Sequence, residues 1–199
     1  MRVAILRLDI GNYGSLIAAM TRLGIDPELW SSARDVSPVD WVILPGVGAL
    51  ANLYGRLEQQ GFLDALPQLK TQGTRFFGIC LGLQAFFGDG AEGGHGMGWL
   101  AGTVPQLNAP ILPHIGFNSI HTSATAPGWL AAFDGAPVYF VHSYRVQPAD
   151  ARHIAATTVY HQEFPSVVIA PPFYGVQFHP ELSGNVGDLF LQRLLASKG

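Results

Sequence analysis

The stretch that could carry chemistry surrounds Cys80, the single cysteine among 199 residues. Residues 76–79 form a short apolar run, Gly78 and Gly82 flank the cysteine, and residues 81–87 are compatible with a short helix. A strand, a sharp turn and a helix make a nucleophile elbow, here with a thiol in place of a hydroxyl. The following helix would point its positive end at the sulfur, which favours the reactive thiolate. A buried structural cysteine is the alternative, because free cysteines are often buried.

A nucleophilic thiol needs a base, and His179 is the best candidate among the seven histidines. It follows an apolar strand predicted at residues 174–178, at the turn that Pro180 makes. This position lies at the carboxyl edge of the sheet, where the elbow also places Cys80. Glu181 could hydrogen-bond the imidazole and fix its tautomer. The same three side chains could instead bind a metal, although no paired Cys or His motif with zinc spacing supports that alternative.

The composition limits the function classes that fit this chain. Apolar residues make up 48% of it and charged residues 13%, so disorder is not expected. The formal net charge of −3 argues against a general binder of nucleic acid or of anionic membranes. One cysteine permits no internal disulfide, which suits a reducing cytoplasm, and no apolar run reaches membrane-spanning length. We therefore expect a cytoplasmic protein with neither a membrane nor a nucleic-acid partner.

The order of the predicted elements indicates an α/β fold. Strands are expected at residues 3–8, 27–30, 41–44 and 76–79, separated by helices at residues 16–23, 53–60 and 62–72. This alternation indicates an open, mostly parallel sheet with helices on both faces. In the C-terminal half we expect antiparallel additions at residues 103–107, 138–141, 144–147, 154–160 and 167–170. No linker divides the chain, so we expect a single domain over residues 1–199.

Two of these segments together carry a family resemblance. G-I-C-L-G-L-Q around the cysteine and Q-F-H-P-E around the histidine resemble the class I glutamine amidotransferases, the triad glutaminases. The resemblance implies an open α/β sheet and a thiol that attacks the carboxamide of glutamine, with a histidine as base and a glutamate as its orienter. At the matching positions these residues are Cys80, His179 and Glu181. The resemblance implies no cofactor and no metal.

Three further segments narrow the resemblance: P-G-V-G-A-L at residues 45–50, P-H-I-G-F-N at 113–118 and Y-F-V-H-S-Y at 139–144. Together they are similar to the glutaminase subunits of imidazole glycerol phosphate synthase, from histidine biosynthesis. Such subunits form a heterodimer with a (β/α)₈ cyclase and pass ammonia to it, and the cyclase forms imidazole glycerol phosphate and an aminoimidazole carboxamide ribotide. Glutaminases of pyridoxal phosphate or anthranilate synthesis, and a non-catalytic binding module with the same fold, are the alternatives. The added segments argue against the first two, and the intact triad argues against the last.

Amide hydrolysis through a thioester needs an oxyanion hole and residues that bind the substrate. The N–H of Leu81, just after the nucleophile, is one candidate donor, and Val47 or Gly48 of the P-G-V-G loop can supply the second. Glutamine must also be held by its amino-acid end. The candidates for that role are Gln84, one helical turn after the cysteine, and the H-S-Y segment, which comprises His142, Ser143 and Tyr144. His142 and Tyr144 could equally be satisfied sheet residues.

The expected partner surface rests on aligned positions. Phe117, Tyr139 and Leu182 align with family positions at the docking face, and His114 and Asn118 are expected to be turn or interface residues. The family usually has Trp where Phe117 stands and Lys where Leu182 stands. We therefore expect a more apolar contact that depends little on salt.

Overall fold

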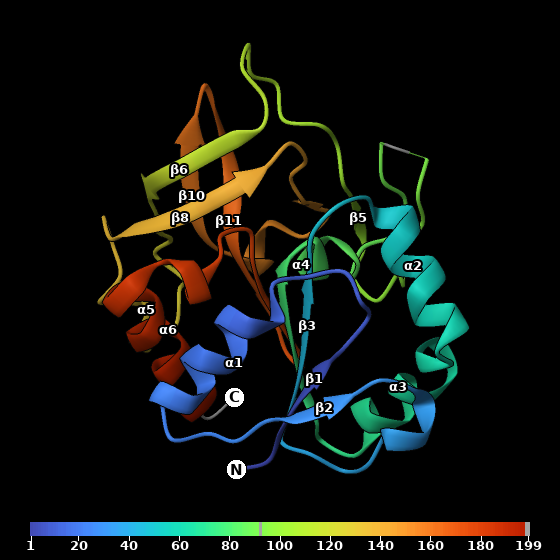
Figure 1. Cartoon of the computed structure of the whole chain (residues 1–199). Helices are drawn as coiled ribbons and strands as arrows, with labels where there is room; N and C mark the ends of the chain where they lie inside the picture. The colour runs from blue at the N-terminus through green and yellow to red at the C-terminus, as the bar shows by residue number, and fades with distance from the viewer. Residues whose placement is uncertain (92, 198–199) are drawn as a thin grey trace.

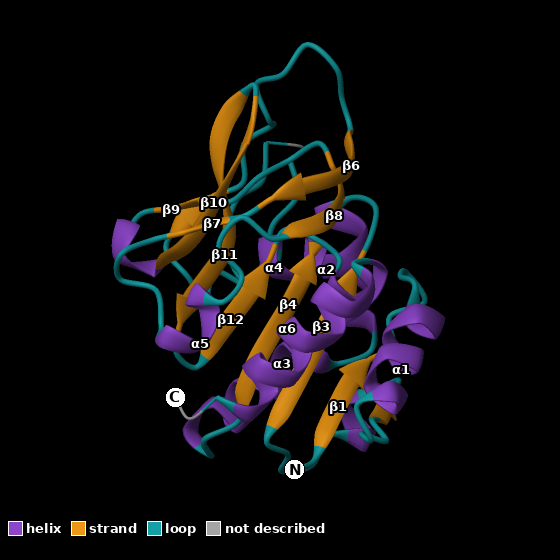
Figure 2. Cartoon of the chain, turned by 90° about the vertical axis from the view of Figure 1, so that its left-hand side faces the viewer, coloured by secondary structure: helices purple, strands orange, loops and turns teal. Residues whose placement is uncertain are grey.

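The computed structural model describes residues 1–91 and 93–197. Within this part of the chain an eight-stranded sheet runs in the order β2-β1-β3-β4-β12-β11-β10-β7 (Figure 1, Figure 2). Its strands are β1 (Val3–Leu6), β2 (Glu28–Trp30), β3 (Trp41–Gly46), β4 (Arg75–Cys80), β7 (His121–Thr122), β10 (Ile154–Tyr160), β11 (Gln162–Ala170) and β12 (Phe173–Val176). Pairing is parallel from β2 to β12 and antiparallel from β12 to β7. This confirms the predicted α/β sheet with antiparallel additions in the C-terminal half.

Helices cover both faces of the sheet, as Figure 1 shows. One face packs against α1 (Tyr13–Arg22), α5 (Gly128–Ala131) and α6 (Gly184–Ala196), and the other against α2 (Leu50–Gln59), α3 (Phe62–Thr71) and α4 (Leu81–Gln84). Successive strand residues point to opposite faces. In β1, Val3 and Ile5 therefore belong to the hydrophobic core beneath α1, α5 and α6, while Ala4 and Leu6 belong to the core beneath α2, α3 and α4. In the described part of the chain, no helix is both long and apolar enough to cross a bilayer.

Two small sheets lie beyond the carboxyl ends of the central parallel strands. β6 (His114–Ser119) pairs with β8 (Pro137–His142), and β5 (Gly102–Thr103) pairs with β9 (Gln147–Pro148). Short 3₁₀ turns, η1 (Ala33–Asp35), η2 (Ala151–His153) and η3 (Pro180–Leu182), complete the elements. Figure 2 shows β6 and β8 above the ends of β3 and β4.

The structure corrects three expectations in this region. The strands predicted at residues 103–107 and 144–147 shrink to the two-residue strands β5 and β9. Pro105 has no N–H to donate, and beyond β5 and β9 the pairing continues only as an isolated bridge between Gln106 and Tyr144. His114 and Asn118 belong to strand β6 rather than to a turn, because the segment pairs residue by residue with β8. The helix after Cys80 is also shorter than predicted.

Candidate active site

Cys80 ends strand β4 and immediately precedes α4. Its backbone has φ 54° and ψ −107°, a conformation that residues with a side chain rarely adopt. Two glycines make this turn possible. A Cβ on Gly78 would lie 2.5 Å from the backbone nitrogen of Leu83, and one on Gly82 would lie 1.7 Å from the carbonyl oxygen of Leu44. The close approach of three backbone segments therefore fixes Cys80 in a strained turn.

The helix that follows the turn is a single turn long. α4 spans Leu81–Gln84, whereas the sequence predicted helix through residue 87. The chain then bends so that its carbonyls accept hydrogen bonds from a later loop, with Met97 N donating to Ala85 O at 2.7 Å and Leu100 N donating to Phe86 O at 2.8 Å. Because one turn aligns few peptide dipoles, most stabilisation of a thiolate must come from side chains around the sulfur.

His179 and Glu181 are buried together beside Cys80. Their side chains are 3% and 4% exposed, and His179 Nδ1 donates to Glu181 Oε1 at 2.8 Å. His179 Nε2 has no hydrogen-bond partner in the described part of the chain. Burial alone would lower the pKa of His179. The Cys80 sulfur and the Glu181 carboxylate outweigh that effect and raise the pKa to about 10. The arrangement therefore favours an imidazolium next to the sulfur, with its free nitrogen available for proton transfer.

A cavity of about 150 Å³ opens above the sulfur. It brings together all the predicted oxyanion and substrate-binding residues, and its lining consists of Val47, Gly48, Cys80, Leu81, Gln84, Val141, His142, Ser143 and Tyr144. Leu81 is the first residue of α4, so its N–H has no acceptor within the helix. Gly48 has φ +100°, a left-handed conformation that favours glycine. The first residue of α4 and the loop that holds Val47 and Gly48 thus border the same small space as the thiol.

The polar residues of the cavity are largely bonded to one another. Gln84 Nε2 donates to Tyr144 O at 3.0 Å, and His142 Nδ1 donates to the same oxygen at 2.9 Å. The other ring nitrogen of His142 lies 3.1 Å from His114 Nδ1. Burial lowers the pKa of both histidines to about 4, so both are neutral at pH 7. Since both nitrogens of His142 are engaged, we interpret it as support for the Ser143–Tyr144 backbone rather than as a direct ligand.

Gln177 is a neighbour of the nucleophile that the sequence analysis missed. It is wholly buried, and its Nε2 lies 3.5 Å from Cys80 Sγ. A signal was available in the sequence, because G-V-Q-F places one uncharged polar side chain inside an otherwise apolar strand, directly before His179. A polar group at such a position must find a partner within the protein.

The residues predicted to meet a partner lie on adjoining elements. Phe117 in β6 is 64% exposed, and its ring centroid lies 5.4 Å from that of Tyr139 in β8. The turn that holds Leu182 is attached to β8, because His179 N donates to Tyr139 O at 2.8 Å. Asn118 differs from the other three, because its amide donates to a carbonyl of β10 at 2.9 Å. Phe117, Tyr139 and Leu182 therefore share one region, whereas the side chain of Asn118 is engaged within the chain.

Metal ligation has little support in this geometry. Across residues 1–91 and 93–197, no group of three or more His, Cys, Asp or Glu side chains is arranged to hold a metal ion.

Comparison with known proteins places the whole chain in one family. The sequence pattern described as "Glutamine amidotransferase class-I" matches residues 8–195. The chain is similar to imidazole glycerol phosphate synthase subunit HisH of Moorella thermoacetica, with 36% identity covering 93% of this chain and 90% of that protein. It is similar to the same subunit of Saccharolobus solfataricus, with 32% identity covering 98% of this chain and 97% of that protein.

Solved structures share the fold at low sequence identity. A crystal structure described as a glutamine amidotransferase superimposes with a TM-score of 0.76 at 16% identity, covering 98% of this chain and 99% of that one. The structure of PurLQS from Thermotoga maritima superimposes with a TM-score of 0.72 at 16% identity, covering 97% of each chain. These likenesses support the assignment of the fold alone.

Proposed function

The chain belongs to the class I glutamine amidotransferases, and from this premise we propose that it is the glutaminase subunit of an imidazole glycerol phosphate synthase. It hydrolyses glutamine to glutamate and ammonia and supplies the ammonia to a cyclase subunit. The observation that carries this function is the cavity above Cys80, where the thiol, the candidate oxyanion donors and the candidate substrate-binding groups meet beside the His179–Glu181 pair. Relatives from several organisms that carry this subunit's name, at 32–37% identity, support the choice of pathway.

The geometry suggests a mechanism in two steps. The Cys80 thiolate attacks the carboxamide carbon of glutamine, and the oxygen that becomes negative accepts hydrogen bonds from Leu81 N–H and from the Val47–Gly48 loop. His179 gives its proton to the departing ammonia, which leaves a thioester on the sulfur. His179 then takes a proton from water, the resulting hydroxide attacks the thioester, and glutamate leaves as the Cys80 thiolate re-forms beside the imidazolium. Glu181 holds the imidazole in the required tautomer throughout.

The variant Cys80→Ser tests whether Cys80 is the nucleophile of glutamine hydrolysis. Serine is far less ionised than cysteine near neutral pH, so glutamine-dependent product formation by the complex with the cyclase should fall below detection. Product formation from added ammonium should continue, because that step takes place on the partner. The ammonium reaction is therefore the internal control for folding and assembly. Glutamine-dependent turnover within about tenfold of wild type would exclude Cys80 as the nucleophile.

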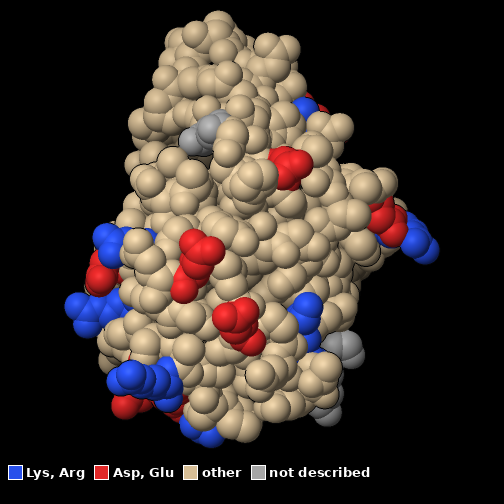
Figure 3. Space-filling view, turned by 90° about the vertical axis from the view of Figure 1, so that its right-hand side faces the viewer, with Lys and Arg blue, Asp and Glu red and all other residues tan. Residues whose placement is uncertain are grey.

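An exposed apolar patch supports the partner proposal. Ile115 and Phe117 lie on the same face of β6, and they are 59% and 64% exposed. Exposed apolar side chains that cluster in this way are typical of a protein-binding surface. Figure 3 shows the opposite side of the molecule, over α2 and α3, where charged side chains gather mainly towards the lower end. We propose that this patch, with Tyr139 and Leu182 at its border, docks on the cyclase in the cytoplasm.

The docking proposal is tested by Phe117→Asp. Burial of a new charge in an apolar contact should weaken binding of the cyclase at least about tenfold, while the melting temperature stays within a few degrees. Leu189→Asp is the matched control, because Leu189 is 42% exposed on α6, outside the patch. Equal losses of affinity in both variants, or none in Phe117→Asp, would place the interface elsewhere.

A further inference from the structure

The sulfur of Cys80 has a buried hydrogen-bond donor behind it. Gln177 Nε2 lies 3.5 Å from Cys80 Sγ, and the carbonyl oxygen of Val141 lies 3.8 Å from the same sulfur. Gln177 is 0% exposed and is absent from the cavity lining, so it contacts the nucleophile without reaching the space for the substrate. The titratable groups around the sulfur are His179, with Glu181 behind it, and the neutral His142.

A single backbone carbonyl determines which end of the Gln177 amide faces the sulfur. Tyr144 O can only accept, so the atom of Gln84 that lies 3.0 Å from it must be the nitrogen. The same Gln84 nitrogen lies 3.2 Å from the Gln177 amide, and it therefore meets the oxygen of that amide. The nitrogen of Gln177 is left facing Cys80. A flipped amide would set two N–H groups against each other and a carbonyl oxygen against the sulfur.

The two neighbours of the sulfur favour opposite protonation states. The Val141 carbonyl can accept a hydrogen bond from the neutral thiol but repels a thiolate. The Gln177 amide can donate to the thiolate but offers nothing to the thiol proton. Hydrogen bonds to a charged group are stronger than those between neutral groups, so the donor has the larger influence once the sulfur ionises.

We propose that Gln177 is a positioning residue that donates a fixed hydrogen bond to the Cys80 thiolate and holds the sulfur in line with the cavity. Gln84 acts as its anchor, because it locks the amide through the Tyr144 carbonyl. The role rests on the proposed function only in its effect on glutamine turnover. Its effect on the reactivity of the thiol is independent of the substrate.

The test is the pH dependence of alkylation by iodoacetamide, measured on the full chain. Because the protein has one cysteine, the rate reports Cys80 alone. Gln177→Met keeps the length of the side chain and removes the donor, so the midpoint of the profile should move upward by about one pH unit. In the complex with the cyclase, kcat for glutamine should fall about tenfold or more, and KM should change little because Gln177 does not line the cavity.

Ser166→Ala is the matched control for loss of a buried polar group. Ser166 is 0% exposed and bonded to Gln177 only through its backbone oxygen, which accepts from Gln177 N at 3.0 Å. Its alkylation profile should match that of wild type. If Gln177→Met fails to fold, Gln177→Leu serves instead, because it also removes the donor without adding a charge, and its profile should also move upward.

Two outcomes separate the role of Gln177 from the proposed function. Active wild-type enzyme with unshifted profiles in the folded Gln177 variants would overturn the positioning role and leave the glutaminase assignment intact. A shifted profile in a protein that hydrolyses no glutamine in the complex would support the role of Gln177 and overturn the proposed function.

Discussion

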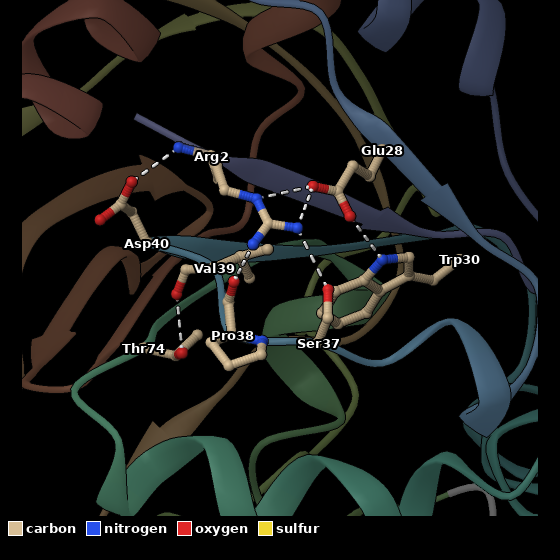
Figure 4. A network of polar contacts seen from close by, with 8 residues as sticks. All are labelled: Arg2, Glu28, Trp30, Ser37, Pro38, Val39, Asp40 and Thr74. Carbon is tan, nitrogen blue, oxygen red and sulfur yellow. Dashed lines mark hydrogen bonds and ion pairs between the residues drawn. The ribbon is translucent and has the colours of Figure 1, made fainter.

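At the amino ends of the parallel strands the polar groups pair with one another, whereas at the carboxyl ends several are left without partners. Figure 4 shows the amino edge, where Arg2 connects neighbouring strands. Its guanidinium donates to Glu28 Oε1 at 2.7 Å and to Pro38 O at 2.7 Å, and its backbone N–H donates to Asp40 at 2.6 Å. Close by, Thr74 donates to the carbonyl of Val39 at 2.8 Å. This edge satisfies its polar groups in ordinary backbone conformations.

The carboxyl edge of the same sheet is built differently. Cys80 is held at a positive φ, and His179 Nε2 and Glu181 Oε2 are buried without hydrogen-bond partners in the described chain. Strain and unpartnered polar atoms each cost stability, and they persist where function requires them. The comparison indicates that the amino edge contributes to holding the fold together while the carboxyl edge keeps groups available for reaction.

The largest loss of stability should come from Gly82→Ala, which places a methyl group inside the strained turn at Cys80. The new Cβ would lie 1.7 Å from the carbonyl oxygen of Leu44, so the backbone must move and the cost should exceed about 4 kcal/mol of unfolding free energy. We expect little soluble, folded protein. Gly55→Ala is the control: its Cβ in α2 meets no atom within 4 Å, and alanine should stabilise that helix by up to about 1 kcal/mol. Similar soluble yields of the two variants would contradict the tight packing of the elbow.

The next effect, mainly on activity, is expected for His179→Ala. Loss of the base should lower glutamine turnover by about 100- to 10,000-fold, measured as glutamate released by the complex with the cyclase. The free energy of unfolding should fall as well, because the variant leaves the buried Glu181 carboxylate without its hydrogen-bond partner. A variant that kept more than about a tenth of wild-type turnover would require a different base.

Acid should destabilise the protein through the carboxyl edge. The pKa values of His114 and His142 are lowered to about 4 by burial, whereas in the unfolded chain they lie near 6.5. Between these pKa values the unfolded state binds more protons than the folded state. The free energy of unfolding therefore decreases as the pH is lowered, by about 3 kcal/mol per ring once the pH reaches 4. His179, with its pKa near 10, is already protonated in the folded state, so its stabilising contribution grows as the pH falls towards 6.5 and stays constant below that value.

Urea unfolding at pH 7.5 and at pH 5 measures this loss. His114→Phe keeps a ring to stack on Tyr160, whose centroid lies 4.0 Å away, and it removes one of the two titrations. The difference in unfolding free energy between the two pH values should therefore shrink relative to wild type. The amino-edge network of Figure 4 contains no histidine, and an equal acid loss in wild type and variant would shift the cause away from this pair.

Glu181→Gln should have a smaller effect than loss of the imidazole. Glutamine can still accept from His179 Nδ1, but it removes the charge that helps to raise the pKa of that imidazole. We expect turnover to fall about 10- to 100-fold, with the pH profile of iodoacetamide alkylation altered because less imidazolium stands beside the sulfur. A loss equal to that of His179→Ala would mean that Glu181 does more than orient the ring.

The sequence predicted the order of the strands and helices better than their lengths and their long-range contacts. Strand and helix order was accessible because β1, β3 and β4 are apolar runs separated by amphipathic helices, and Cys80 and His179 follow from their places at strand ends. The lengths of α4, β5 and β9 were not accessible, since they depend on tertiary backbone contacts. The contacts of Gln177 and His114 were missed because each partner is distant in the chain.

The smallest effect is expected for Arg2→Ala, at the edge that has no part in the proposed chemistry. Arg2 and Glu28 have side chains 57% and 38% exposed, and exposed ion pairs contribute at most about 1 kcal/mol. Arg2 also binds Pro38 O, so the loss should lie at the upper end of that range and shrink in high salt. Arg22→Ala is the matched control, because Arg22 makes a comparable ion pair at 2.7 Å with a single partner, Asp188. Urea unfolding should show the larger loss for Arg2→Ala, and glutamine turnover should match wild type in both variants. Reduced turnover in a stably folded Arg2→Ala would instead mean that the two edges are coupled through the strands, and the division of labour between them would have to be abandoned.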